Sequence, residues 1–190
     1  MKTYQESSDD ALMVLYADGD SLAFEELFRR HAASVFSYLL RATNDRALAE
    51  DLFQATFLHL HRSRKSYRAG FFKTFLFTIA TNLLRDERSG AEHKHRTTSK
   101  AEEAETDHAS DAVTAPSPEA MAVAAETGRV LEQAIAALPE GMREVVLLSR
   151  YHGLSNAEIA GVLGISQGAV KVRLFRALTQ LRVKLALHAE

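Results

Sequence analysis

The sequence predicts an all-α fold with two small helical domains, on the basis of three observations. Apolar residues recur at the three- and four-residue spacing of helices, and no segment alternates like a strand. Residues 89–118 lose this periodicity and gather Glu, Thr, Ser, Ala and two prolines, a composition that cannot bury a core. Residues 155–181 have the pattern of two helices joined by a turn at Gly164. We therefore expect domains at 1–95 and 119–190, a flexible acidic linker at 96–118, and a helix-turn-helix that ends the second domain.

Length and composition limit the class of protein. The chain has 190 residues, of which 46% are hydrophobic and 25% charged, as in one or two ordinary globular domains. No apolar run is long enough to span a membrane, and the N-terminal MKTYQESSDD is acidic, unlike a signal peptide. We therefore expect a cytoplasmic protein without a membrane span. The absence of cysteine excludes disulfides, thiol catalysis and cysteine-ligated zinc.

Charge is segregated along the chain, although the formal net charge is only −2. Residues 52–85 and 161–189 contain basic side chains and no carboxylate side chain, whereas residues 101–128 contain acidic side chains and no Lys or Arg. Two basic segments therefore flank an acidic one. This arrangement favours a nucleic-acid-binding protein more than the net charge alone would indicate.

Two helices are expected to open the first domain and to serve as scaffold. Ser8 is placed to cap a helix that ends at Asp18-Gly19-Asp20, and residues 22–41 carry apolar positions at helical spacing. We interpret the charged side chains of the second helix as ordinary surface charges: Glu25, Glu26, Arg29, Arg30 and His31.

The third predicted helix, 45–62, has a face that suggests a partner surface. Asn44 is the predicted N-terminal cap. Stepping the helix at 100° per residue directs one set of side chains to the core: Ala49, Leu52, Phe53, Thr56 and Leu60. The opposite side is polar, but Leu58 lies in its middle and Phe57 on its edge. Apolar groups within a polar face indicate a site for a partner, and single exposed hydrophobic residues are the alternative.

The next segment combines a basic loop, 63–70, with a fourth predicted helix, 71–88. Its predicted apolar stripe is Phe72, Phe75, Leu76, Ile79, Ala80 and Leu83. The opposite face carries Phe71, Thr74, Thr78, Thr81, Asn82 and Arg85. Such a face could hold single-stranded nucleic acid, with phosphates on the cations and unstacked bases on aromatic rings or an amide. An ordinary solvated helix face remains the alternative.

The second domain is predicted to contain helices at 119–137 and 142–151, followed by the helix-turn-helix. Ser155 and Glu158 form a capping box, and Gly164 ends the short helix that they begin. Ser166 caps a second helix that reaches residue 187. Its exposed face carries Gln167, Lys171, Arg173 and Arg176. This arrangement is typical of a helix that enters the major groove, and a merely solvated basic face is the alternative.

An enzyme is a weaker interpretation. His59 and His61 stand two residues apart, so on a helix they point about 200° apart and cannot share a metal ion. His93 and His95 lie near the linker without an evident third ligand. No nucleophile motif or phosphate-binding glycine loop is present. We expect no catalytic residue, no metal and no cofactor.

Three segments together carry a resemblance to a known family. They are AEDLFQATFLHLHRSRKSYR, FKTFLFTIATNLLRDERS and ALPEGMREVVLLSRYHGLSNAEIAGVLGISQGAVKVRLFRAL. In this order they resemble the core-binding helix, the promoter-melting helix and the terminal helix-turn-helix of bacterial RNA polymerase sigma factors of the extracytoplasmic-function (ECF) group of the sigma-70 family. The resemblance implies an alternative sigma factor that directs promoter recognition and strand opening. The implied partners are core RNA polymerase, promoter DNA and an anti-sigma factor.

The resemblance also implies three sets of site residues. The set that would dock on the polymerase is Asp51, Gln54, Phe57 and Leu58. The set that would hold the melted promoter element is Tyr67, Arg68, Phe71, Lys73, Thr78, Asn82 and Arg85. The set that would grip the duplex promoter element is Arg150, Ser155, Lys171, Arg173, Phe175 and Arg176, to which the basic face of the last helix adds Gln167.

The chain departs from the family pattern at three positions. Phe75 stands where the family usually has Trp, and Ala169 and Val172 replace a Thr and a Ser. Two hydroxyls that could contact DNA are therefore missing, so we expect the phosphate contacts to remain and the sequence preference to shift. The residues leave one alternative function open: a helix-turn-helix regulator that binds DNA without acting as a polymerase subunit.

Overall fold

The computed structural model describes residues 4–95 and 118–187. The elements of the first domain are η1 (Tyr4–Glu6), α1 (Asp9–Ala17), α2 (Ser21–Thr43), α3 (Arg46–Ser63), η2 (Arg64–Ser66) and α4 (Phe72–His95). Those of the second domain are α5 (Pro118–Ala136), α6 (Glu140–Val146), the π-helical segment η3 (Leu147–Tyr151), α7 (Asn156–Leu163) and α8 (Gln167–Leu187). Every regular element in the described ranges is helical, which confirms the all-α prediction. The predicted linker lies outside them, apart from Pro118 at the start of α5.

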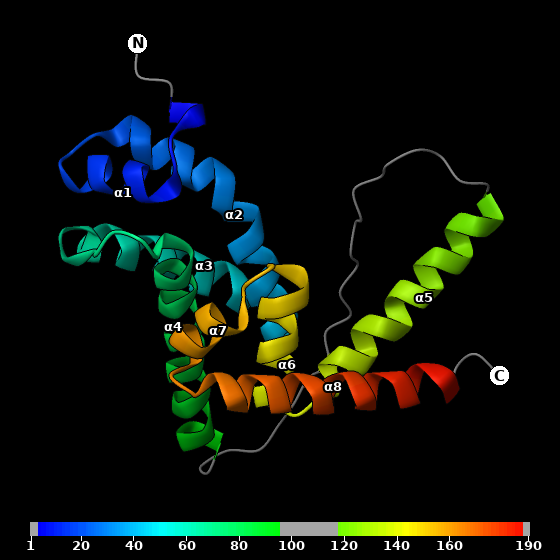
Figure 1. Ribbon diagram of the computed structural model, residues 1–190. Helices are drawn as coiled ribbons and strands as arrows, with labels where there is room; N and C mark the ends of the chain where they lie inside the picture. The colour runs from blue at the N-terminus through cyan, green and yellow to red at the C-terminus, as the bar shows by residue number, and fades with distance from the viewer. Residues whose placement is uncertain (1–3, 96–117, 188–190) are drawn as a thin grey trace.

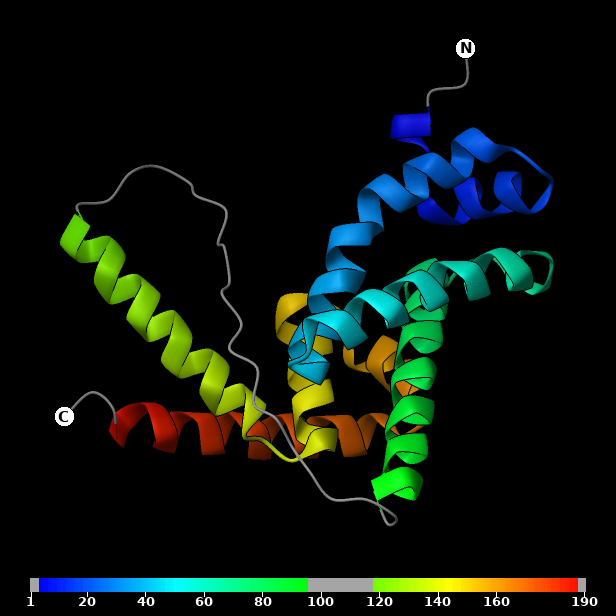
Figure 2. The ribbon, with the colours of Figure 1, turned by 180° about the vertical axis from the view of Figure 1, so that it is seen from behind.

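The two domains touch each other along α4 and the C-terminal half of α2. Figures 1 and 2 show α6 and α7 lying in the angle between these two helices, with α8 running past the end of α6. Helix α5 packs on α8 and extends away from the first domain. The C-terminal helices therefore cover one side of the first domain.

Each domain has a core of fully or almost fully buried apolar side chains. Those of the first domain include Leu12, Leu27, Tyr38, Leu39, Leu60, Leu76 and Phe77. Those of the second include Val145, Leu147, Leu148, Ile159, Val162 and Val170. Burial of this kind is the main force that holds such helices together.

Helix α4 departs from the predicted pattern of burial. Thr81, predicted on the open polar face, is fully buried, and its hydroxyl lies 3.0 Å from that of Tyr38. Phe77, outside the predicted stripe, is also fully buried, whereas Phe75 and Ile79 are only half-buried. These predictions were wrong because α4 packs against helices of both domains, which buries more than one stripe.

The helix ends follow the sequence signals with two exceptions. Ser8 accepts from the Ala11 amide, and Ser155 forms its capping box with Glu158, as predicted. Asn44 does not cap α3, because it ends α2 in the left-handed region at φ 54°, and Asp45 accepts from the Leu48 amide instead. Helix α4 continues seven residues beyond the predicted end at residue 88, to His95.

Glu26 is a buried structural residue, so its interpretation as a surface charge was wrong. Only 8% of it is exposed. Its Oε1 accepts from Arg29 at 2.6 Å and from Arg30 at 2.7 Å. These hydrogen bonds, that of Arg29 first, lower the pKa of Glu26 to about 2. Arg30 also donates to the main-chain carbonyls of residues 4, 5 and 7, so the network ties the N-terminal segment to α2.

Neutralising Glu26 is expected to remove part of the acid dependence of stability. Its folded-state pKa lies below the ordinary 4.5. Above about pH 4.5 the ionised carboxylate therefore stabilises the fold, and this contribution to stability is lost as the pH falls toward about 2. In urea titrations Glu26→Gln should be less stable than the wild type at about pH 7, and the gap should narrow by about pH 3. Glu25 is an exposed neighbour, so Glu25→Gln should have the same free energy of unfolding as the wild type at both pH values. A difference between Glu26→Gln and the wild type that does not change with pH would contradict this account.

Candidate nucleic-acid interface

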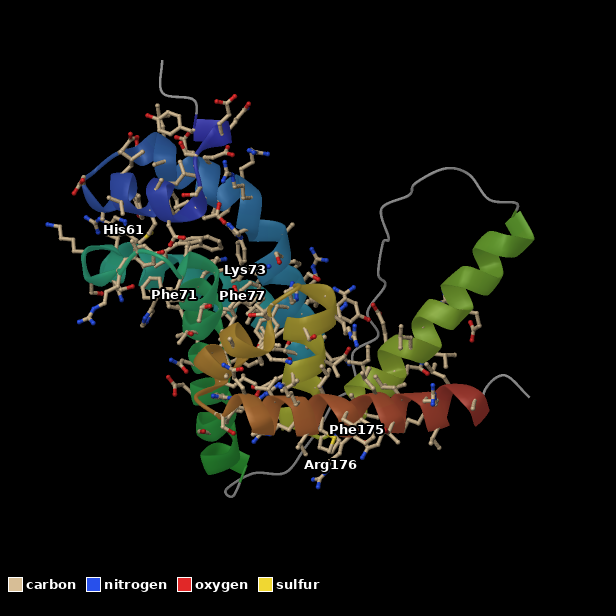
Figure 3. The ribbon with its side chains drawn as sticks, in the orientation of Figure 1. His61, Phe71, Lys73, Phe77, Phe175 and Arg176 are labelled. Carbon is tan, nitrogen blue, oxygen red and sulfur yellow. The ribbon has the colours of Figure 1, made fainter. Side chains whose placement is uncertain are left out.

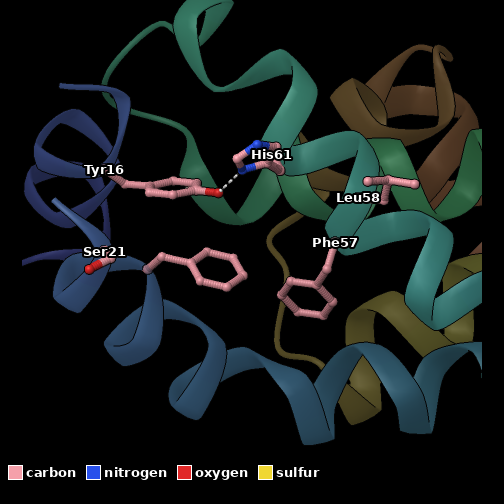
Figure 4. A pocket seen from close by; sticks show the side chains of 6 residues that line it. Tyr16, Ser21, Phe57, Leu58 and His61 are labelled. Atoms are coloured by element: carbon pink, nitrogen blue, oxygen red, sulfur yellow. Dashed lines mark hydrogen bonds between the residues drawn. The ribbon is translucent and has the colours of Figure 1, made fainter. Parts of the chain in front are cut away.

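The outer side of α3 presents the residues predicted to dock on a polymerase. Asp51, Gln54 and Leu58 are exposed, and the Leu58 residue is 48% accessible. Phe57 is only 8% exposed and forms part of a groove. This groove has a volume of about 490 Å³ and is lined by Tyr16, Ser21, Phe24, Phe57, Leu58 and His61 (Figure 4). The structure therefore gives α3 an apolar spot and an adjoining apolar groove between polar residues.

The loop before α4 is held in place by a carboxylate from α1. Asp10 accepts hydrogen bonds from the Tyr67 hydroxyl, from the Gly70 amide at 2.8 Å and from the Phe72 amide at 3.2 Å. Burial, followed by the bond to Asp10, raises the pKa of Tyr67. The Tyr67 ring is half-buried against Phe72 and Phe75. Asp10 thus anchors the loop and satisfies the first amide of α4.

The remaining predicted strand-binding residues divide into two groups. Arg68, Phe71 and Asn82 are exposed, and 68% of Phe71 is accessible. Lys73 and Arg85 instead contact the second domain: Lys73 Nζ donates to the His152 carbonyl, and Arg85 Nη2 lies 3.0 Å from Glu144 Oε2. Thr78 lies between the two groups along α4, half-buried, and its hydroxyl donates to the Thr74 carbonyl at 2.7 Å.

His152 of the second domain inserts into the first. Its ring lies 5.1 Å from that of Phe77 and 5.7 Å from that of Tyr38, and its Nδ1 lies 2.9 Å from Ser34 Oγ. Burial, and then the charges of Arg41 and Lys73, lower the pKa of His152 to about 4. The imidazole is therefore neutral at neutral pH, and Figure 3 shows Lys73 and Phe77 where α4 meets the second domain.

Helix α8 presents the predicted duplex-binding face to solvent. Gln167, Lys171, Phe175 and Arg176 are exposed, with 72% of Phe175 accessible, and Arg173 is half-buried. Figure 3 shows Phe175 and Arg176 projecting from the side of α8 that faces away from α7. The other predicted members, Arg150 and Ser155, are exposed at the end of η3 and at the start of α7. The Ser155 hydroxyl is engaged in the capping box.

Sequence reasoning missed three side chains that shape these faces: Asp10, Glu144 and His152. The sequence did indicate that Glu144 is buried, because it lies four residues before the apolar Leu148 and so shares its face of the helix. Leu148 is fully buried and Glu144 is 3% exposed. A buried carboxylate requires a partner, and Arg85 is that partner. Asp10 and His152 offered no comparable signal, because their partners are distant in sequence.

The described residues form neither a metal-binding cluster nor a membrane-spanning helix. Among the side chains that the structure describes, no cluster of His, Asp and Glu is arranged to hold a metal ion. His93 and His95 lie outside those side chains. No helix in the described ranges is both long enough and apolar enough to cross a membrane.

Two family descriptions match the chain in the order of its domains. Residues 27–93 match sigma-70 region 2, which includes α3, the loop and most of α4. Residues 128–181 match sigma-70 region 4, which includes the helix-turn-helix.

Individual relatives agree with these matches. The chain is 39% identical to the RNA polymerase sigma factor CarQ of Myxococcus xanthus, over 90% of this chain and 93% of that protein. It is 35% identical to the ECF RNA polymerase sigma factor SigE of Mycolicibacterium smegmatis, over 93% of this chain and 68% of that protein. The solved structure of CnrH in complex with the cytosolic domain of CnrY is similar, with a TM-score of 0.69, 25% identity and coverage of 95% of this chain and 99% of that one. The chain therefore belongs to the sigma-70 family of RNA polymerase sigma factors, in its ECF group.

Proposed function

We propose that this chain is an alternative sigma factor whose two domains bind core RNA polymerase and two elements of one promoter. The observation that carries this proposal is the exposed apolar spot at Leu58, flanked by Asp51 and Gln54, in a chain that also ends in a basic helix-turn-helix. A regulator that only binds duplex DNA needs the helix-turn-helix but has no need of such a spot. A sigma factor needs both surfaces.

The three faces take different parts in initiation. On α3, Asp51, Gln54, Phe57 and Leu58 would dock on the polymerase. The loop and α4 would capture unstacked bases and phosphates of the opened strand, through Tyr67, Arg68, Phe71, Lys73, Thr78, Asn82 and Arg85. Residues of α8, with Arg150 and Ser155, would hold the duplex element. The polymerase supplies the chemistry, and the sigma factor contributes binding energy and position.

Typical energies of base stacking are large enough to support this role of the loop and α4. Stacking a base on an aromatic ring is worth about 1–3 kcal/mol, which helps to offset the unpairing of a base pair. Phe71 has the exposure that stacking requires. Binding of one domain makes binding of the other effectively intramolecular, so two weak contacts give a useful total affinity.

Transcription in vitro tests the proposed function directly. Purified chain would be added to bacterial core polymerase on promoters selected by enrichment with the same mixture. We expect RNA synthesis from defined start sites only when the chain is present. Duplex binding without any polymerase-dependent start would instead indicate the helix-turn-helix regulator.

Replacing Asn82 by alanine is expected to impair strand opening more than duplex binding. Asn82 is exposed on α4 beside the strand-binding cations, and its amide can hydrogen-bond an unstacked base. In permanganate footprinting the reactivity of the promoter bubble should fall about five-fold or more, whereas the holoenzyme should still bind duplex promoter DNA. Gln180→Ala, which removes an exposed amide from α8, serves as control. A normal bubble with Asn82→Ala would refute the role given to this residue.

A protein partner and a location complete the proposal. CnrH was solved with the cytosolic domain of CnrY bound to it. We propose that an anti-sigma factor likewise binds the present chain, and that the chain acts in the cytoplasm, where the polymerase acts. It carries out no catalysis of its own.

A further inference from the structure

The outward face of α8 has an apolar centre between two cations. Among the side chains of α8 that the structure describes, the large apolar ones exposed to solvent are Val172, Phe175 and Val183, at 49%, 72% and 57%. Lys171 and Arg176 are exposed next to the first two. With 3.6 residues per turn, successive side chains around this face are separated by about 40°, 60° and 40°, in the order Lys171, Phe175, Val172 and Arg176. Val172 and Phe175, called the apolar pair below, therefore lie side by side in the middle of the face.

Arg173 does not belong to this outward face. It is half-buried, and its Nη1 lies 3.0 Å from the position that a Cβ on Gly141 would occupy, so its guanidinium packs against α6. Figure 3 shows Phe175 and Arg176 on the side of α8 that is turned to solvent. The sequence has no carboxylate side chain between residues 161 and 189. The apolar pair is therefore flanked by cations in a segment that contains no negative side chain.

The major groove offers one apolar group that such a pair can contact. The base edges in the groove present hydrogen-bond donors and acceptors, and the 5-methyl group of thymine is the apolar exception. Neither Val172 nor Phe175 has a side-chain donor or acceptor, so a thymine methyl group is the feature of a base pair that they can distinguish. Cations on both sides of the pair suit the phosphates that border the groove. A protein surface is the other occupant that an apolar pair can take, and the charge around this pair favours DNA.

We propose, on the basis of the function proposed above for α8, that Val172 and Phe175 recognise thymine methyl groups in the duplex promoter element. Lys171 and Arg176 bind the phosphates on either side. The departure from the family pattern at position 172 then has a consequence for specificity. The serine of that pattern can form a hydrogen bond with a base edge, whereas valine can only cover a methyl group. The sequence preference therefore shifts toward T·A pairs beneath the apolar pair.

Uracil in place of thymine tests this assignment, because it removes the 5-methyl group and keeps every hydrogen-bonding group of the base. Duplexes are first selected from a random pool by the full chain together with core polymerase. Copies of a selected duplex then carry uracil at random thymine positions, and bound and free molecules are separated and cleaved at uracil. Covering one methyl group is worth about four-fold in affinity, so we expect binding to weaken about four-fold at one thymine or more. A duplex with no such thymine would overturn the inference.

Replacing the apolar pair should abolish this sensitivity to uracil. Val172→Ser/Phe175→Ser keeps Lys171 and Arg176, so the phosphate contacts remain. The double variant should bind the thymine duplex about four-fold more weakly than the wild type, or worse. With uracil at the sensitive positions the two proteins should bind equally, because the methyl groups that the pair would cover are already absent.

Val183→Ser is the matched control for the double variant. Val183 is also exposed on α8, about three turns beyond Val172. This variant should keep the sensitivity of the wild type to uracil at every position. If the double variant also keeps that sensitivity at every position, the methyl groups are recognised elsewhere and the inference is overturned.

Binding to core polymerase, measured separately, distinguishes DNA from a protein partner. If Val172→Ser/Phe175→Ser binds core polymerase more weakly than the wild type and uracil has no effect, the apolar pair belongs to a polymerase surface and the inference is overturned. Failure of the proposed function gives a different result, in which the chain with polymerase selects no duplex and starts no RNA synthesis. The chain alone then selects the duplex for the same uracil test, because a helix-turn-helix regulator would also bind DNA through α8. If the chain alone selects no duplex either, the inference fails as well.

Discussion

A sigma factor with glutamate in place of Leu58 is expected to lose its activity in transcription because it no longer binds core polymerase. Leu58 is the exposed apolar residue on the polar face of α3, and 48% of it is accessible in the free chain. Because Leu58 is already about half covered, burying the rest contributes about 1 kcal/mol, and burying a carboxylate in its place costs more. A total loss of about 3 kcal/mol or more corresponds to an affinity lower by about a hundred-fold.

Val183→Glu provides the matched control for this experiment. Val183 is 57% exposed on α8, in the other domain and outside every proposed site. Both variants gain one negative charge at an exposed apolar position, so a general effect of charge would lower both affinities. Titration of fluorescently labelled chain with core polymerase measures the affinity. Wild-type binding by Leu58→Glu would show that the polymerase docks elsewhere.

Local signals predicted the ends of the helices well where one residue alone could act as the cap. Ser155 and Glu158 define the start of α7 without help from the rest of the fold, and Gly164 ends it at φ 66°. Asn44 and Asp45 are adjacent, and either side chain can cap a helix. Which of the two caps α3 depended on the end of α2, which needed a residue in the left-handed region. Asparagine enters that region more readily than most residues, so the end of one helix decided the start of the next.

Burial on α4 could not be read from its periodicity. The sequence shows one apolar stripe, and the prediction assumed one neighbouring surface. The contact of Phe77 and Tyr38 with His152 comes from a segment more than seventy residues away in the sequence. Thr81 is buried because its hydroxyl finds a partner on Tyr38. The contact of Phe77 with His152 depends on domain docking, for which the sequence offered only the indirect signal of a carboxylate at Glu144.

The site residues were easier to predict than the contacts that hold them. Among the residues proposed as sites, Leu58 interrupts the polar face of its helix and Arg176 lies on a basic face, so both were visible in the sequence, whereas Phe175 was assigned from the family resemblance. Asp10 anchors the loop through bonds to residues sixty positions away, and no local pattern marks it. The same holds for Glu26, whose arginine partners lie three and four residues ahead but whose burial depends on the N-terminal segment.

Removing Lys171 and Arg176 together is expected to weaken promoter binding and to flatten its dependence on salt. Both side chains are exposed on α8 beside Phe175, and no acidic residue follows Gly161 before the last residue of the chain. Each contact between a cation and a phosphate contributes about −0.9 to the slope of log affinity against log salt. Lys171→Ala/Arg176→Ala should therefore make the slope of log affinity against log salt less negative by about 1.8. The affinity for duplex promoter DNA should fall about ten-fold or more at low salt.

Arg182→Ala/Lys184→Ala separates contact from overall charge, because it removes the same charge from the same helix nearer its C-terminus. Both residues are exposed and lie outside the proposed DNA face. Holoenzyme binding to a labelled promoter duplex would be measured across a salt series, with core binding measured separately. The control pair should keep a slope near that of the wild type, since screening reduces the influence of distant charges. Equal losses for the two pairs would mean that α8 attracts DNA by its net charge and that Lys171 and Arg176 do not form the specific face. Loss of core binding with Lys171→Ala/Arg176→Ala would contradict the assignment of polymerase docking to α3, because these residues belong to the other domain.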